Sequence, residues 1–254
     1  MTAVTHTGNI QKGGALLDDS RRLIEAWDVD SSTELNLERI VSENLLGKAT
    51  RRRAEDLLRR SLRPRLVEPG IHVMSALKDL LTDPAALSAA LYYETSRDET
   101  LLAAFAEGPL FDWYHAGRTS VTIDDTTAWI AELASSGAMP ATTAIVRTKV
   151  ARGLLAALRD FGVLEGATNK RFAHPHLPLR GFVYVAFRLH DQGASSTALV
   201  TSSVWRRWLL DRDRVDDLLF QAARGGLLDY GVVGSAVRVD WHVASIEEAV
   251  RAAA

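Results

Sequence analysis

Apolar residues recur at helical spacing along most of this chain, and this periodicity constrains the fold more than any other feature of the sequence. The clearest case runs from residue 142 to residue 161, where one side of the expected helix carries Ile145, Val146, Val150, Leu154, Leu155 and Leu158. Only a few short segments have the character of strands. The sequence therefore predicts a mainly α fold, a helical bundle with little sheet.

Three successive helices are expected in the N-terminal part of the chain. They run from residue 15 to 27, from a cap at 31–33 to about 45–47, and from the cap Thr50 to about Leu62. Ser and Thr are favoured helix caps, and Pro64 disfavours helical geometry in the residue before it. Three short helices of which the last is basic are typical of a helix-turn-helix-like unit, whose third helix can lie in a DNA groove.

Further helices and a few strands are expected beyond this unit. The helices cover 74–81, 85–93, 98–115 with a break at Gly108-Pro109, 124–135 and 142–161. Residues 163–166 and 171–172 look like a strand pair, and residues 181–190 fit either a helix or an extended segment. The chain then shows a short helix at 204–210, a helix at 213–223, and strands at 227–231 and 236–241 joined around Gly234. Helix, helix and hairpin in this order outline a winged-helix-like unit with a short β-hairpin.

These elements suggest a division of the chain into three parts. Residues 1–14 are expected to be flexible, residues 15–136 to form a helical domain with the helix-turn-helix-like unit, and residues 137–254 to form a C-terminal domain. The loop at Gly137 to Pro140 marks the expected boundary.

Composition narrows the class of protein. The 254 residues are 47% hydrophobic and 24% charged, as in globular proteins, and include no cysteine. A chain without cysteine forms no disulfide or thiolate metal site and suits a reducing compartment. The N-terminus lacks the apolar core of a signal peptide, and no apolar run approaches the ~20 residues needed to span a bilayer. We therefore expect a cytoplasmic protein without a membrane partner.

Charge is segregated along the chain although the net charge is only −2. Between Gly47 and Arg65 eight basic residues accompany two acidic ones, for a local charge of +6, whereas acids outnumber bases between Asp18 and Glu34. A nearly neutral protein can in this way present one positive face.

The third expected helix carries this charge on one side. At about 100° per residue its alanine and leucines gather on one face. On the other face an arc of roughly 120° holds Arg52, Arg53, Arg59, Arg60 and Arg63. Such a helix can lie in a DNA groove and contact phosphates. The predicted DNA-binding residues are Lys48, Thr50, Arg51, Arg52, Arg53, Arg59, Arg60 and Arg63, with Arg147 and Lys149 of the later basic helix as a weaker second group.

Other interpretations of these charges remain open at the sequence level. The arginines can simply be solvated, or they can pair with the acidic segment 18–34 or with Asp56. The same face could also bind RNA by its shape. In the C-terminal part, arginines and aspartates alternate, which favours a solvated or protein-binding surface over one that contacts DNA.

No catalytic apparatus stands out, so we expect neither an enzyme nor a cofactor. The chain has no Walker loop, no Gly-x-Gly-x-x-Gly, no Gly-x-Ser-x-Gly and no His-Glu-x-x-His motif. His174 and His176 lack a nearby third metal ligand, so no metal site is expected. Asp124 and Asp125 are explained by capping at a helix N-terminus.

Several segments together resemble the BrxA family of bacteriophage-exclusion (BREX) defence systems. They are Lys12 to Arg21 with its Gly-Gly-Ala-Leu-Leu and acidic-Ser-Arg pattern, Ser42 to Lys48, Thr50 to Arg53, the helix end from Arg59 to Leu66, Tyr92 to Arg97, and Val146 to Leu164. The acidic pair Asp18-Asp19 departs from the single acid of the family pattern. The resemblance implies a non-enzymatic accessory protein that binds double-stranded DNA and works with other BREX proteins. The alternative is a protein–protein adaptor within the defence complex.

Overall fold

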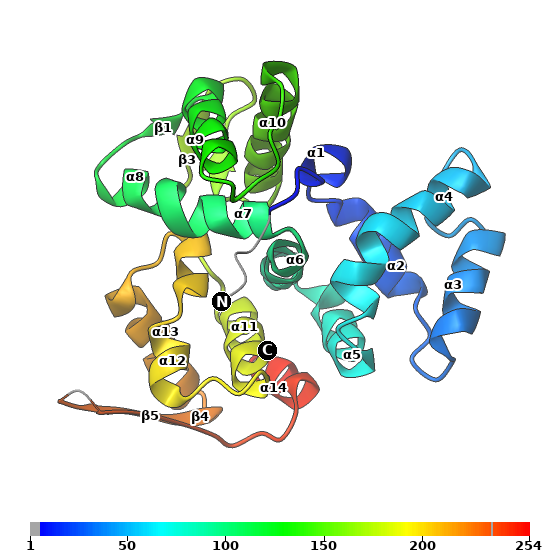
Figure 1. The fold of residues 1–254 in the computed structure, drawn as a ribbon. Helices are drawn as coiled ribbons and strands as arrows, with labels where there is room; N and C mark the ends of the chain where they lie inside the picture. Colours follow the sequence, from blue (N-terminus) through cyan, green and yellow to red (C-terminus); the bar gives the residue numbers. More distant parts are fainter. Residues whose placement is uncertain (1–5, 235) are drawn as a thin grey trace. The chain divides into compact units, whose positions relative to one another are not determined.

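The computed structural model describes residues 6–234 and 236–254, and helices dominate them (Figure 1). Two small antiparallel sheets accompany the helices, one of three strands in the order β1-β3-β2 and one of two strands, β4-β5. The predicted mainly α fold with a short C-terminal hairpin is thus confirmed. No helix in the described part of the chain combines the length and the apolar character needed to cross a membrane.

The chain forms two compact units that interleave along the sequence. Unit 1 comprises the described residues up to Ala15, Thr95–His176 and Ser203–Leu210. Unit 2 comprises Leu16–Glu94, Leu177–Ser202 and Asp211–Ala254. The boundary expected near residue 137 lies inside unit 1, where the helices on either side of it pack against each other.

Unit 2 begins with α2 (Leu17–Ala26), α3 (Thr33–Ser42) and α4 (Arg51–Leu57). These helices confirm the three that the periodicity predicts. The hydroxyl of Ser32 accepts the backbone N–H of Leu35, and that of Thr50 accepts the backbone N–H of Arg53. Both caps satisfy N–H groups that the first helical turn leaves without a partner.

The third helix does not end near Leu62, so that prediction is wrong. It continues from α4 into η1, a π-helix over Leu58–Val67 that contains Pro64. In an α-helix the proline ring collides with the carbonyl four residues earlier, and the chain passes Pro64 in π-helical and not α-helical geometry. The continuation buries Leu58, Leu62 and Leu66, which recur every fourth residue.

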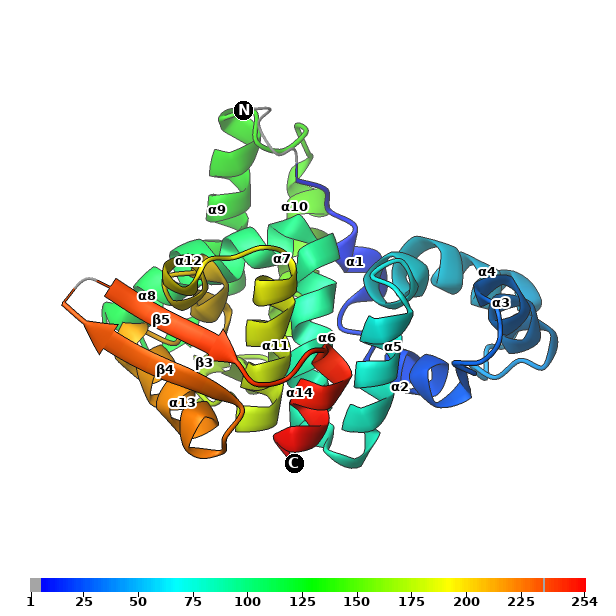
Figure 2. The same cartoon turned by 90° about the horizontal axis from the view of Figure 1, so that it is seen from below.

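The rest of unit 2 is helical apart from its hairpin. It contains α5 (Ile71–Asp79), η2 (Leu80–Thr82), most of α6 (Pro84–Asp98), α11 (Leu179–Asp191), α12 (Ser196–Val200), α13 (Arg212–Arg224), β4 (Leu228–Val233), β5 (Ala236–Trp241) and α14 (Ile246–Ala252). Helix α11 settles the ambiguity over residues 181–190, and every residue from Gly181 to Leu189 is buried. Figure 2 shows α13 beside the hairpin, whose register pairs Leu228 with Trp241.

Unit 1 contains the remaining elements. They are α1 (Ile10–Gly13), α7 (Thr100–Phe105), η3 (Ala106–Leu110), α8 (Phe111–His115), β1 (Ser120–Val121), α9 (Ile123–Ser135), α10 (Ala144–Asp160), β2 (Leu164–Glu165), β3 (Lys170–Phe172) and η4 (Ser203–Trp208). The expected break at Gly108-Pro109 is confirmed, because Gly108 has a non-helical backbone.

The described N-terminal residues pack within unit 1. Ile10 of α1 is fully buried, and α1 lies against α10. A Cβ on Gly153 of α10 would lie 2.8 Å from the Cα of Gln11, so this close approach depends on the glycine. Residues 6–14, which the sequence suggests to be flexible, thus include a packed helical turn, and residues 1–5 lie outside the described residues.

Candidate nucleic-acid interface

Six arginines project from α4 and η1 into solvent and form what we call the arginine face. Its members are Arg51, Arg52, Arg53, Arg59, Arg60 and Arg63. Four of their side chains are 72%, 71%, 60% and 51% exposed, in the order Arg51, Arg59, Arg60, Arg63. The opposite side of the helix buries Ala54 and three leucines in unit 2. Packing of the apolar side therefore holds the guanidinium groups outward.

Three carboxylates lie among these arginines and partly offset their charge. Glu55 accepts from Arg51 at 2.8 Å, and Glu68 lies 3.7 Å from Arg63. Asp56 is shared, at 2.9 Å from Arg59 and 3.6 Å from Arg60. Exposed pairs of this kind contribute ~0–1 kcal/mol, so a stronger anion can displace them.

The electrostatics of Asp56 show how positive this face is. The hydrogen bond donated by Arg59 holds the pKa of Asp56 below its usual value, and the charges of Arg60 and Arg52 add to the effect. The carboxylate stays ionised at neutral pH and faces more than one guanidinium. A single acid does not neutralise such a group of arginines.

Arg52 and Arg53 are the most available cations of the arginine face. Both side chains are exposed, and neither forms an ion pair within 4.0 Å in the described part of the chain. They sit in the first turn of α4, directly after the Thr50 cap. With six arginines and three carboxylates, the face keeps an excess of positive charge.

Lys48 differs from the arginines, and the acidic segment explains why. Its ammonium pairs with Asp19, and only 19% of its side chain is exposed. Of the residues predicted to bind DNA, Lys48 alone pairs with an acid of segment 18–34 within the described residues. Thr50 acts as the helix cap, and Arg65, which adds to the local charge in the sequence, is buried.

The second predicted group lies on α10, in unit 1. Arg147 donates to the backbone carbonyl of Thr142 and is half-buried, whereas Lys149 is exposed. The predicted DNA-binding residues are therefore divided between the two units, and the larger set belongs to unit 2.

Unit 1 also has a polar groove of about 900 Å³ that the sequence analysis missed. Segments 119–124 and 168–171 line it together with Thr148 and Arg152 of α10, and Arg152 and Arg171 are its exposed cations. The sequence places Arg152 on the polar side of a helix and Arg171 in a strand. No local pattern brings them together, because the groove exists only once β1 has paired with β3.

A family model described as BrxA matches residues 5–188, a range that contains both the arginine face and the groove. No curated protein matches the chain in sequence. Among solved structures, the chain is similar to the crystal structure of an uncharacterized protein from Magnetospirillum magneticum. The TM-score is 0.60 at 17% identity, over 80% of this chain and 97% of that one, which supports the fold alone.

Proposed function

Because the chain belongs to the BrxA family, which implies a role in BREX phage defence, we propose that it binds double-stranded DNA through the arginine face. The observation that carries the proposal is the exposure of six arginines beside only three carboxylates on α4 and η1. The proposed role is non-enzymatic and cytoplasmic, and other BREX proteins are its proposed protein partners.

Guanidinium groups suit this task because their planar donors match phosphate oxygens. Phosphate contacts position a protein on the duplex without reading its sequence. In the proposed complex α2, α3 and α4 act as a helix-turn-helix-like unit, and α4 lies in or beside the major groove, which is ~12 Å wide. Arg52 and Arg53 have no ion pair within 4.0 Å among the described residues, so they would bind phosphates without first breaking one.

A charge-reversal variant tests the proposal. We expect Arg52→Glu combined with Arg53→Glu to weaken duplex binding by about tenfold or more, since two charge-assisted contacts are lost and two repulsions are gained. Fluorescence anisotropy with a 20-bp duplex would measure the effect. Neither side chain packs in the core, so circular dichroism and the melting temperature should stay close to those of the wild type.

Arg21→Glu provides the matched control. Arg21 is an exposed arginine of α2 in the same unit, paired with Glu25 at 2.8 Å. Its reversal changes the net charge of the molecule without touching the arginine face. Unchanged duplex binding by the double variant, or an equal loss in Arg21→Glu, would contradict the proposal.

One observation favours the alternative function of a protein–protein adaptor. At the hairpin of unit 2, Val233 is 82% exposed and Val232 is 43% exposed, and Phe220 of α13 is 47% exposed. Apolar side chains at such a site are typical of protein contacts. Loss of co-purification with other BREX proteins in Val233→Asp, together with no duplex binding by the wild type, would favour the adaptor.

A further inference from the structure

Hydrogen bonds fix the backbone of two walls of the polar groove in unit 1. One wall is the turn between β2 and β3, which carries Thr168 and Asn169. The ammonium of Lys170 is buried and donates to the backbone carbonyls of Gly166 and Ala167. Burial and the nearby Arg159 lower the pKa of Lys170. The buried ammonium of Lys170 therefore stabilises the turn through these hydrogen bonds and is not available to a ligand as a free cation.

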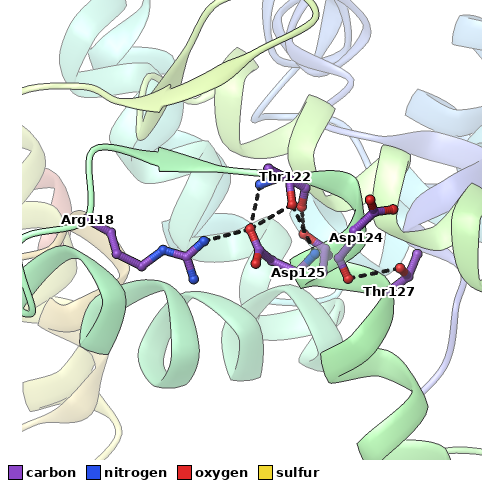
Figure 3. A network of polar contacts seen from close by, with 6 residues as sticks. Arg118, Thr122, Asp124, Asp125 and Thr127 are labelled. Atoms are coloured by element: carbon purple, nitrogen blue, oxygen red, sulfur yellow. Dashed lines mark hydrogen bonds and ion pairs between the residues drawn. The ribbon is translucent and has the colours of Figure 1, made fainter.

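The opposite wall is the junction of β1 and α9, where a capping box fixes the backbone (Figure 3). The Thr122 hydroxyl accepts the N–H of Asp125 at 3.1 Å, and the Asp125 carboxylate accepts the N–H of Thr122 at 2.9 Å. Arg118 donates to the same carboxylate at 2.7 Å. The expectation that Asp124 and Asp125 serve capping is confirmed for Asp125, whereas Asp124 lines the groove.

Helix α10 completes the groove. Thr148 and Arg152 are four residues apart and so lie on the same side of the helix. Arg171 faces them from β3, where it lies opposite Ser120 of β1 and Glu165 of β2. The hydroxyls of Thr122 and Thr148 already donate to Asp125 and to the backbone carbonyl of Ala144. The groove therefore offers a ligand two guanidinium groups together with the hydroxyls of Thr119, Ser120 and Thr168.

The charge of the lining is positive. Arg152 and Arg171 form no ion pair within 4.0 Å among the described residues, although Glu165 is the cross-strand neighbour of Arg171. Asp124 is the single acid among the residues that line the groove. An anionic ligand would supply the counter-charge that neither arginine finds among the described residues.

We propose that this groove binds the phosphate group of a phosphorylated ligand. Arginine forks and hydroxyl donors suit phosphate oxygens, and about 900 Å³ is within the ~300–1,000 Å³ typical of small-molecule sites. No aromatic ring lines the groove, so it offers no platform for stacking a base. Recognition therefore rests on the phosphate, which a free nucleotide or a nucleic-acid backbone can equally supply. The inference is independent of the proposed function, because it uses none of the arginine face.

Calorimetric titration of the full chain tests this site with pyrophosphate, ATP, and single-stranded and duplex DNA of twelve nucleotides or base pairs. We expect at least one probe to bind, and its affinity to fall on the order of tenfold for each arginine lost in Arg152→Gln and Arg171→Gln. The lysine variants Arg152→Lys and Arg171→Lys should retain part of the binding, because they keep the charge.

The matched control is Arg159→Gln. Arg159 lies on the same helix but pairs with Asp160 at 2.6 Å and does not line the groove. Binding of none of the probes, or equal binding by the wild type and the double glutamine variant, would overturn the proposal. A response to pyrophosphate or ATP identifies a small phosphorylated ligand. A response to DNA alone identifies a nucleic-acid backbone only where it persists in Arg52→Glu/Arg53→Glu and is lost in Arg152→Gln/Arg171→Gln. The arginine-face variant Arg52→Glu/Arg53→Glu should bind pyrophosphate or ATP as tightly as the wild type does. Any DNA binding that this variant retains should be lost when Arg152→Gln and Arg171→Gln are added to it, which separates failure of this site from failure of the proposed function.

Discussion

The charged residues of this protein fall into two kinds that differ in burial. On the arginine face, ion pairs such as Arg51 with Glu55 lie in water, where they are weak and exchangeable. In the core of unit 2, Glu94 is fully buried and accepts from Tyr184 at 2.9 Å and from Arg188 at 2.8 Å. The first kind is available to a ligand, and the second holds the fold.

We expect Glu94→Gln to destabilise the protein strongly. The Arg188 side chain is only 8% exposed, so loss of the carboxylate charge leaves a buried cation without its counter-charge. Removing one partner of such a pair lowers the free energy of unfolding by about 3–5 kcal/mol. Urea unfolding, monitored by circular dichroism, would measure this free energy of unfolding. Glu55→Gln, which breaks an exposed pair, should change stability by less than about 1 kcal/mol. A similar loss of unfolding free energy in the two variants would show that the buried pair contributes no more to stability than the exposed one.

At the scale of single elements, local chemistry accounts for most helix starts and tertiary contact accounts for the exceptions. Ser32 and Thr50 cap helices as their residue types predict. Helix α11 could not be assigned from its apolar periodicity because it is buried from Gly181 to Leu189. Its polar stripe, which includes Tyr184 and Arg188, faces the buried Glu94 and not water. The π-helix η1 passes through Pro64, since burying the leucines at positions 58, 62 and 66 outweighs the preference of proline for a helix end.

The turn between β2 and β3 should depend on one glycine. Gly166 has φ +88°, and a Cβ there would lie 2.3 Å from the carbonyl oxygen of Asn169. We expect Gly166→Ala to distort the turn and lower the melting temperature. Gly162 has φ +78° with open space around its Cβ position, so Gly162→Ala should incur only the ~1–2 kcal/mol of the left-handed conformation. A smaller effect of Gly166→Ala than of Gly162→Ala in thermal unfolding would contradict this account of the turn.

For the whole molecule, the distribution of charge is more informative than its total. A net charge of −2 does not attract a polyanion. A local positive face attracts it even when the total charge is slightly negative. The cations of interest lie in both units: the arginine face in unit 2, and the pair Arg152 and Arg171 in unit 1.

Salt dependence tests the duplex interaction at this scale. Each phosphate neutralised contributes about −0.9 to the slope of log affinity against log salt concentration. We expect a slope of about −3 to −5 for the wild type, because three carboxylates compete with the phosphates for six arginines. Anisotropy titrations between 50 and 200 mM salt, roughly the range over which such binding weakens, would give the slope. In Arg52→Glu/Arg53→Glu this slope should be less negative by about 2, because two phosphate contacts are lost. A wild-type slope near zero is incompatible with binding through the arginine face.

The sequence by itself determined the features that depend on neighbours along the chain. These include the helical class, the caps, the break at Gly108, the C-terminal hairpin and the exposure of the arginines opposite a leucine seam, since helical periodicity and capping are local. Tertiary structure alone decided what depends on distant segments. It paired Lys48 with Asp19, continued the third helix through Pro64, interleaved the two units along the sequence and brought Arg152 and Arg171 to one groove. The physical reason is that burial and ion pairing depend on which surfaces meet, and residues far apart in sequence carry no local pattern for that meeting.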